Sequence, residues 1–141
     1  MPNLTIPAEE VSVLLIAGAA RSGTTLLSNL LDSHSQIVCF PFEDNVLDCF
    51  YRKKIRDKRF YLNEFISNYE CGQQSMLFNE KLVLVYKRKI EHIYRQKFDI
   101  DIDFHSARKA YLEYLTERPL SVQNIYVALG RAVIAGAPGY A

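Results

Sequence analysis

Residues 15–27 read LIAGAARSGTTLL and join an apolar run to an amphipathic stretch. Gly18 and Gly23 have the spacing of the phosphate-binding pattern G-x-x-x-x-G-K-[ST], but Thr24 stands where that pattern has lysine. Arg21 is the only cation in the loop. A glycine-rich turn between a strand and a helix directs several backbone N–H groups and the positive end of the helix dipole toward one point. The stretch therefore predicts an anion site that uses arginine in place of lysine.

The segments on either side of this loop predict a strand, a helix and a second strand. Residues 11–17 (VSVLLIA) form a short apolar run rich in β-branched residues, typical of a strand buried on both faces. Leucines recur at helical spacing after Thr24, and residues 36–40 (QIVCF) form a second candidate strand that Pro41 stops. Such a βαβ unit is right-handed. We expect an α/β, P-loop-containing nucleotide-binding fold built on a parallel sheet.

The chain beyond residue 43 predicts mainly helices. Apolar residues recur there at helical spacing in four stretches, namely Val46, Leu47, Phe50 and Tyr51; Leu82, Tyr86, Ile90, Ile93 and Phe98; Phe104, Ala107, Tyr111, Tyr114 and Leu115; and Val122, Ile125, Tyr126, Leu129 and Val133. Pro119 fits the start of the last helix and Gly136 its end. Residues 81–86 (KLVLVY) fit a strand as well as a helix. Since strand candidates are few, we expect one partial domain, 1–141, with an incomplete sheet: strand, loop, helix and strand over 11–43, and mainly helix over 44–141.

Composition excludes little. The chain has 141 residues, 49 % of them hydrophobic, and a net charge of +1, with no repeat or low-complexity tract. Cys39, Cys49 and Cys71 lack the close spacing of a zinc or redox site, so we expect buried thiols and no bound metal. The longest apolar run, residues 13–20, is too short to span a bilayer, and no basic leader precedes it. We expect a cytoplasmic protein with neither a membrane span nor a nucleic-acid partner.

The loop and the helix after it resemble a known family. Residues 18–37, GAARSGTTLLSNLLDSHSQI, are similar to the 5′-phosphosulfate-binding loop of sulfotransferases that use 3′-phosphoadenosine 5′-phosphosulfate (PAPS). The similarity is closest to the branch with tyrosylprotein, heparan-type and bacterial sulfotransferases, and it covers residues 13–43. Ala20 and Ser35 depart from it, because both stand where the family usually has proline.

The resemblance implies roles for particular residues. Backbone and hydroxyl groups would hold the 5′-phosphate, at Ser22, Gly23, Thr24 and Thr25. Arg21 would contact the sulfuryl side of the donor. The reaction implied is transfer of a sulfuryl group from PAPS to a hydroxyl of a sugar, tyrosine, lipid or small metabolite, without a metal.

Glu43 is the candidate general base, since in that branch a glutamate follows the second strand. Sulfuryl transfer is an in-line displacement, so the attacking hydroxyl must lose its proton to a carboxylate opposite the leaving phosphate. A carboxylate at the carboxyl end of a strand, beside the loop of the neighbouring strand, lies in the right crevice. Three alternatives stay open: Glu43 and Asp44 open the next helix, Asp44 is the base, or His34 is the base rather than a hydrogen-bonding residue at a helix end.

The remaining expectations concern whether the donor site is complete, what the basic clusters do, and which other functions fit the sequence. We find no later strand followed by an arginine and a serine to bind the 3′-phosphate of the donor, so we expect a fragment with little or no activity of its own. Basic clusters at residues 52–59 (RKKIRDKR) and 87–89 (KRK) are either solvated helix faces or attract an anionic acceptor or the donor's phosphates. The rival functions are another P-loop protein such as a kinase, and a non-catalytic interaction protein derived from a sulfotransferase.

Overall fold

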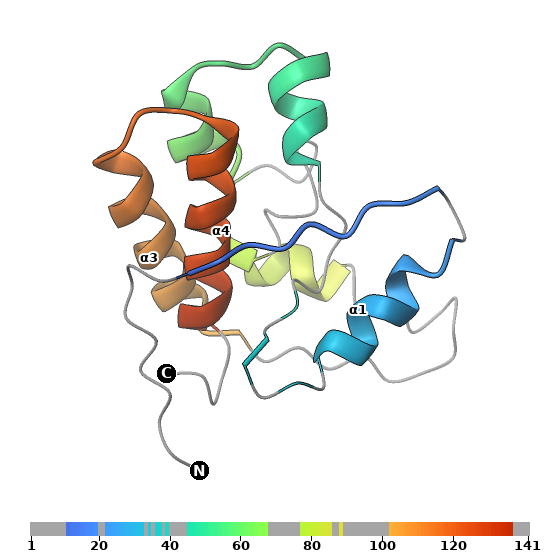
Figure 1. The fold of residues 1–141 in the computed structure, drawn as a ribbon. Coiled ribbons are helices and arrows are strands. Elements are labelled where there is room, and N and C mark those ends of the chain that lie inside the picture. Colours follow the sequence, from blue (N-terminus) through green and yellow to red (C-terminus); the bar gives the residue numbers. More distant parts are fainter. Residues whose placement is uncertain are drawn as a thin grey trace.

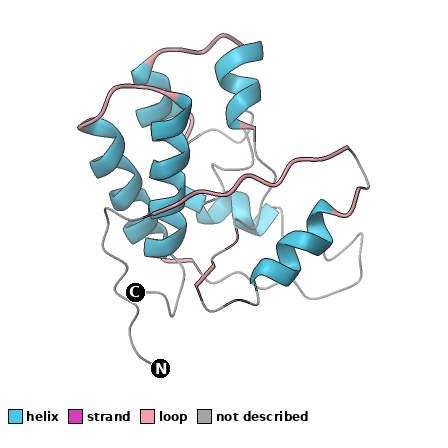
Figure 2. Cartoon of the chain, in the orientation of Figure 1, coloured by secondary structure: helices cyan, strands magenta, loops and turns pink. Residues whose placement is uncertain are grey.

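The computed structural model describes residues 11–19, 22–32, 34, 36–37, 39, 45–67, 77–85, 88 and 102–136. Within these ranges the regular elements are all helical (Figure 2). They are α1 (Thr24–Asp32), the π-helical turns η1 (Asp48–Arg52) and η2 (Phe60–Glu64), a short helix over 80–85, α3 (Phe104–Thr116) and α4 (Val122–Gly136). In that part of the chain, no helix is long and apolar enough to cross a membrane.

The expected parallel sheet is wrong for the described residues. Residues 11–19 form an extended segment that is not a strand, and residues 36–37 and 39 of the second candidate strand are not one either. Residues 81–85, which fitted both a strand and a helix, are helical. An apolar run that ends at a glycine predicts a buried segment. A sheet also requires a neighbouring strand to pair with the backbone N–H and C=O groups, and the run itself does not provide one.

The extended segment instead crosses α4 and then leads away toward α1 (Figure 1). Side-chain methyl carbons of Val11 and Val13 lie 3.2 and 3.3 Å from the position that a Cβ on Gly130 would take. After Val13 the run is mostly solvated, because Leu14 is 73 % exposed and Leu15 is 51 % exposed, whereas Ile16 is half-buried. The segment is therefore held by one side of a helix rather than buried on both faces.

The helices α3 and α4 form an antiparallel pair, and both were predicted (Figure 1). The Asp103 carboxylate caps α3, accepting hydrogen bonds from the backbone N–H groups of His105 (3.1 Å) and Ser106 (3.0 Å). Ser121 caps α4, since its hydroxyl accepts from the Asn124 N–H at 3.1 Å. A capping hydroxyl or carboxylate satisfies one of the N–H groups that a helix start leaves unpaired, which is why each helix begins where it does.

The core lies between this helix pair and the η1–η2 region. An aromatic cluster joins Tyr61, Phe65, Phe78 and Tyr111, with ring centroids of Phe78 and Tyr111 4.9 Å apart. The Tyr111 hydroxyl donates to the Tyr61 carbonyl oxygen at 3.2 Å, inside the core. Burial, with a smaller contribution from Tyr61, raises the pKa of Tyr111 well above its usual value. Contacts between α3 and distant segments thus fix the protein's best-packed part.

The apolar residues predicted to share one buried helix face over 46–51 do not all lie on a buried face in the structure. Val46 is buried, whereas Leu47 and Tyr51 are 45 % and 56 % exposed. The turn here is π-helical, with the Lys53 N–H donating to the Asp48 carbonyl at 3.0 Å, so its side chains do not follow the 3.6-residue period. Of the three cysteines expected to be buried, Cys49 is buried, Cys39 is half-buried, and Cys71 lies outside the described residues.

Candidate phosphate-binding loop

A tight turn connects the extended segment to α1. The Ser22 N–H donates to the Ala19 carbonyl oxygen at 3.1 Å, and the first turn of α1 is closed by the Leu27 N–H donating to the Gly23 carbonyl at 3.0 Å. Gly23, between these two hydrogen bonds, has a φ of +87°. That left-handed conformation favours glycine, so the second glycine of the motif is required by the backbone itself.

Gly18 makes room for two side chains of the loop. A Cβ at this position would overlap the Ser22 hydroxyl oxygen and would lie 2.9 Å from Cγ2 of Thr24. The two side chains therefore fold back over the Gly18 backbone, which has no side chain to obstruct them. A Cβ on Gly23, by contrast, would meet nothing within 4 Å, so the backbone there faces open space at the helix start.

The loop places polar groups where an anion can bind. The N–H groups of Thr24, Thr25 and Leu26 precede the first i to i−4 hydrogen bond of α1, so they have no partner within the helix. The dipole of the nine-residue helix adds positive potential at this end. The Ser22 side chain is exposed and Thr24 is half-buried beside it. These groups can bind an anion such as a phosphate, and the open approach to Gly23 leaves room for it.

The structure brings together part of the predicted site. Ser22, Gly23 and Thr24 lie together at the loop, and the Thr25 backbone belongs to the first turn of α1. Arg21 and Glu43, predicted as loop cation and general base, lie outside the described residues, as does Asp44.

His34 has the structural role that was one of its two interpretations. Its backbone N–H donates to the Leu31 carbonyl at 2.9 Å, and its Nδ1 accepts from the Gln36 N–H at 3.2 Å. The side chain is exposed and closes the turn that ends α1. These contacts account for a histidine at this position without a catalytic role.

The sequence did not single out Ala19, whose carbonyl oxygen closes the loop. Every residue type has a backbone carbonyl, so the sequence does not mark this acceptor, and only the structure shows it. Across the described ranges, no group of three or more His, Cys, Asp or Glu side chains is placed to hold a metal ion.

The loop and the start of α1 define a candidate anion site. A family model described as Sulfotransferase family matches residues 14–126, which include the loop, α1, η1, η2, α3 and the start of α4. The chain therefore belongs to the sulfotransferase family, whose members take a sulfonate group from a donor and pass it to an acceptor. No curated protein and no solved structure matches the chain.

Proposed function

We propose that this protein transfers a sulfuryl group from PAPS to a hydroxyl-bearing acceptor. The observation that supports the donor assignment is the turn at the start of α1, with Gly23 at a φ of +87° followed by N–H groups that have no partner within the helix. Thr24 is too short and has no charge to reach the terminal phosphates of ATP as a loop lysine does. The same turn suits a 5′-phosphate that carries one transferable group.

In the proposed binding mode the chain's own groups hold the 5′-phosphate. The backbone N–H groups of Gly23, Thr24 and Thr25 and the hydroxyls of Ser22 and Thr24 donate to phosphate oxygens. Hydrogen bonds to a charged acceptor are stronger than those between neutral groups. Arg21 supplies the positive charge toward the sulfuryl oxygens, where a guanidinium can donate two parallel hydrogen bonds.

In the proposed reaction, the acceptor oxygen forms a bond to sulfur as the bond between sulfur and the 5′-phosphate oxygen breaks. Glu43 takes the proton of the acceptor hydroxyl, and the phosphate leaves with the electron pair. Negative charge then grows on the leaving phosphate, where the N–H groups of α1 stabilise it. Proton transfer to a positioned carboxylate contributes a rate factor of about 10²–10⁴.

Isothermal calorimetry tests the donor site directly. We expect the chain to bind 3′-phosphoadenosine 5′-phosphate in preference to ATP with magnesium. Thr24→Val, which keeps the shape and removes the hydroxyl, should weaken binding about tenfold, from the loss of one hydrogen bond to a charged group. The matched control is Thr116→Val, the same change at the far end of α3, which should leave the affinity unchanged. Preference for ATP with magnesium would contradict the proposal and favour a kinase-like function.

The base is tested by comparing Glu43→Gln with Asp44→Asn. Transfer of labelled sulfuryl from PAPS is measured into a panel of sugars, tyrosine peptides, lipids and small alcohols. In the intact chain, whose transfer rate we expect to be low, Glu43→Gln should lower that rate about 100-fold or more while nucleotide affinity stays the same. Asp44→Asn, its neighbour with the same loss of charge, should retain turnover. If neither change affects transfer, or if Asp44→Asn alone abolishes it, the role given to Glu43 is wrong.

A further inference from the structure

Positive charge is concentrated in one short part of the chain. Residues 47–59 contain six Lys and Arg against two Asp, a net charge of +4. Since the whole chain has a net charge of +1, all other residues together carry −3. Such an asymmetry concentrates positive potential locally even though the overall charge is near zero.

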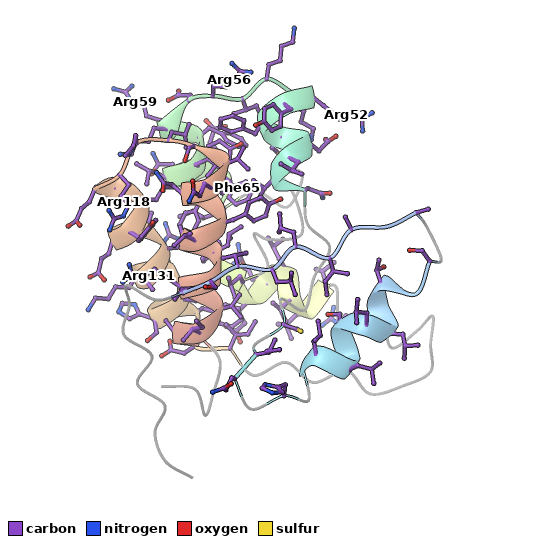
Figure 3. The ribbon with its side chains drawn as sticks, viewed as in Figure 1. Arg52, Arg56, Arg59, Phe65, Arg118 and Arg131 are labelled. Carbon is purple, nitrogen blue, oxygen red and sulfur yellow. The ribbon has the colours of Figure 1, made fainter. Side chains whose placement is uncertain are left out.

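The structure shows that this part is not the solvated helix face that was one interpretation of its sequence. Residues 53–57 form the loop between η1 and the helical turn before η2. Arg52, Arg56 and Arg59 follow one rim of the molecule, on the side away from α1 (Figures 1 and 3). Lys53 and Lys54 are exposed as well, and the Arg52 side chain is 84 % exposed.

Lys58 joins a second, distant segment to this rim. Its Nζ donates to the Thr116 carbonyl oxygen at 2.7 Å and to the Arg118 carbonyl oxygen at 2.8 Å, satisfying acceptors at the end of α3. The Arg118 guanidinium lies over the Tyr114 ring at 4.5 Å, and that of Arg56 lies over the Phe50 ring at 5.8 Å. We call residues 52–59 together with Arg118 the basic rim.

The acidic groups near the basic rim are fewer than its cations. Asp48 pairs with Arg52 at 3.1 Å, and an Asp57 carboxylate oxygen accepts from the Arg59 backbone N–H at 2.9 Å. Glu117, next to Arg118 in sequence, is exposed. The seven Lys and Arg residues of the basic rim thus outnumber these three carboxylates, and all of the seven except Lys58 are exposed.

Two apolar side chains flank the cations. Leu47 and Tyr51 are four residues apart, Tyr51 directly precedes Arg52 in the sequence, and the two side chains are 45 % and 56 % exposed. A tyrosine and a leucine beside exposed Lys and Arg match the composition of surfaces that lie in the headgroup region of a bilayer. A soluble anionic polymer would use the cations but would have no need of Leu47.

We propose that the basic rim binds an anionic lipid surface, with Leu47 and Tyr51 entering the headgroup region. The outward position of the rim suits a flat, extended partner that several side chains reach at once. Because the basic rim and the phosphate-binding loop share no residue, this binding is separate from the proposed transfer reaction. Its effect is to hold the protein at a membrane surface while the loop stays accessible.

Vesicle sedimentation tests this proposal without any measurement of transfer. Vesicles of phosphatidylcholine alone are compared with vesicles containing about 30 % phosphatidylserine. We expect the intact chain to sediment with the anionic vesicles only, and to be released as salt is raised toward about 0.5 M.

The variant Lys53→Gln/Lys54→Gln/Arg59→Gln removes three exposed cations of the basic rim. Because each cation near such a surface contributes about fivefold to binding, affinity should fall at least about tenfold. The matched control is Lys81→Gln/Arg108→Gln/Lys109→Gln, which removes three exposed cations elsewhere and changes net charge equally. The control should bind within about twofold of the intact chain.

A second variant, Leu47→Ser/Tyr51→Ser, tests the apolar contacts. It should reduce the binding that persists at intermediate salt, since apolar burial is not screened. Helical circular dichroism of each variant should match that of the intact chain.

Three results would overturn the proposal. The rim variant and its control could lose the same affinity, which would indicate a net-charge effect alone. The chain could sediment equally with neutral vesicles, which would indicate apolar adsorption. It could also bind heparin or DNA while ignoring both vesicles, which would assign the rim to a soluble polyanion.

Discussion

Gly136 lies where the last turn of α4 meets the first turn of α3. The sequence suggested this glycine as a helix end, and the helix does end there. The structure adds a packing reason: a Cβ at Gly136 would lie 2.9 Å from the Ala107 Cβ and 3.3 Å from the Asp103 carbonyl oxygen. The Asp103 N–H also donates to the Gly136 carbonyl at 2.9 Å, which holds the two helix ends together.

Replacing this glycine should separate the helix ends. We expect Gly136→Ala to lower the free energy of unfolding by about 1–3 kcal/mol, because rigid backbone and a buried Cβ leave the new methyl no space. Gly130→Ala is the control in the same helix, where the new methyl would meet, among the described residues, the side chains of Val11 and Val13. That change should be close to neutral, because the helix preference of alanine over glycine, about 1 kcal/mol, offsets the close contacts with these two side chains. Urea unfolding of both variants is the measurement, and equal losses would contradict the prediction.

At the scale of elements, α3 depends on the charge of its cap. Hydrogen bonds from the Ser106 hydroxyl (2.6 Å) and the Ser106 N–H lower the pKa of the Asp103 carboxyl below its ordinary value of 3.8, with a smaller contribution from the His105 N–H. A carboxyl whose pKa is lower in the folded state stabilises the fold at pH values above its unfolded pKa. That contribution is lost as the pH falls below the unfolded value and through the folded one.

We therefore expect the intact chain to lose stability as the pH is lowered from 6 to 3, partly through Asp103. Asp103→Asn keeps a capping oxygen that does not titrate, so its stability should vary less with pH over this range. Asp103→Ala removes the cap and should be less stable than Asp103→Asn at every pH. Thermal unfolding across the range is the measurement, and identical pH profiles for the intact chain and Asp103→Asn would show that the cap is not responsible.

At the scale of the whole molecule, packing is uneven. Residues of η2, α3 and α4 form most of the core, and Leu115 and Ile125 are completely buried there. By contrast, α1 presents Leu26 and Leu30 to solvent, each 64 % exposed. Apolar contacts that hold a helix in place are thus abundant for α3 and α4 and few for α1.

This contrast predicts where stability resides. Leu115→Ala should lower the free energy of unfolding by about 2–5 kcal/mol, as expected for a fully buried leucine. Leu30→Ala, the same change on an exposed face, should cost less than about 0.5 kcal/mol. Amide hydrogen exchange should show stronger protection in α3 and α4 than in α1. Comparable losses for the two variants would mean that α1 packs in solution as tightly as the core helices.

Sequence patterns predicted the elements whose contacts are local. The stripes of α3 and α4 follow the helical period because both helices bury one face against a neighbour joined by a short connection. The apolar pattern gave the wrong element at residues 11–17. An apolar run predicts that a segment is buried, but it does not say which other segment it packs against. The pattern also failed at residues 46–51, since a π-helical turn changes which side chains share a face.

For the candidate site, the motif identified Gly18, Gly23 and the hydroxyl residues after them, and the structure supplies the reasons for both glycines. It could not identify the Ala19 carbonyl, because turn closure by a backbone atom has no side-chain signature. The roles of Arg21 and Glu43 stay predictions that depend on the family resemblance.

The amino-acid sequence by itself determined the loop motif, the family, and the helices α3 and α4, because each depends on residues close together in the chain. Only the tertiary structure decided that residues 11–17 lie extended across α4 at Gly130, and that Lys58 joins the basic loop to the end of α3. These contacts link residues about 60 to 120 positions apart. Their formation depends on which surfaces remain available after the core has packed, and no local pattern encodes that.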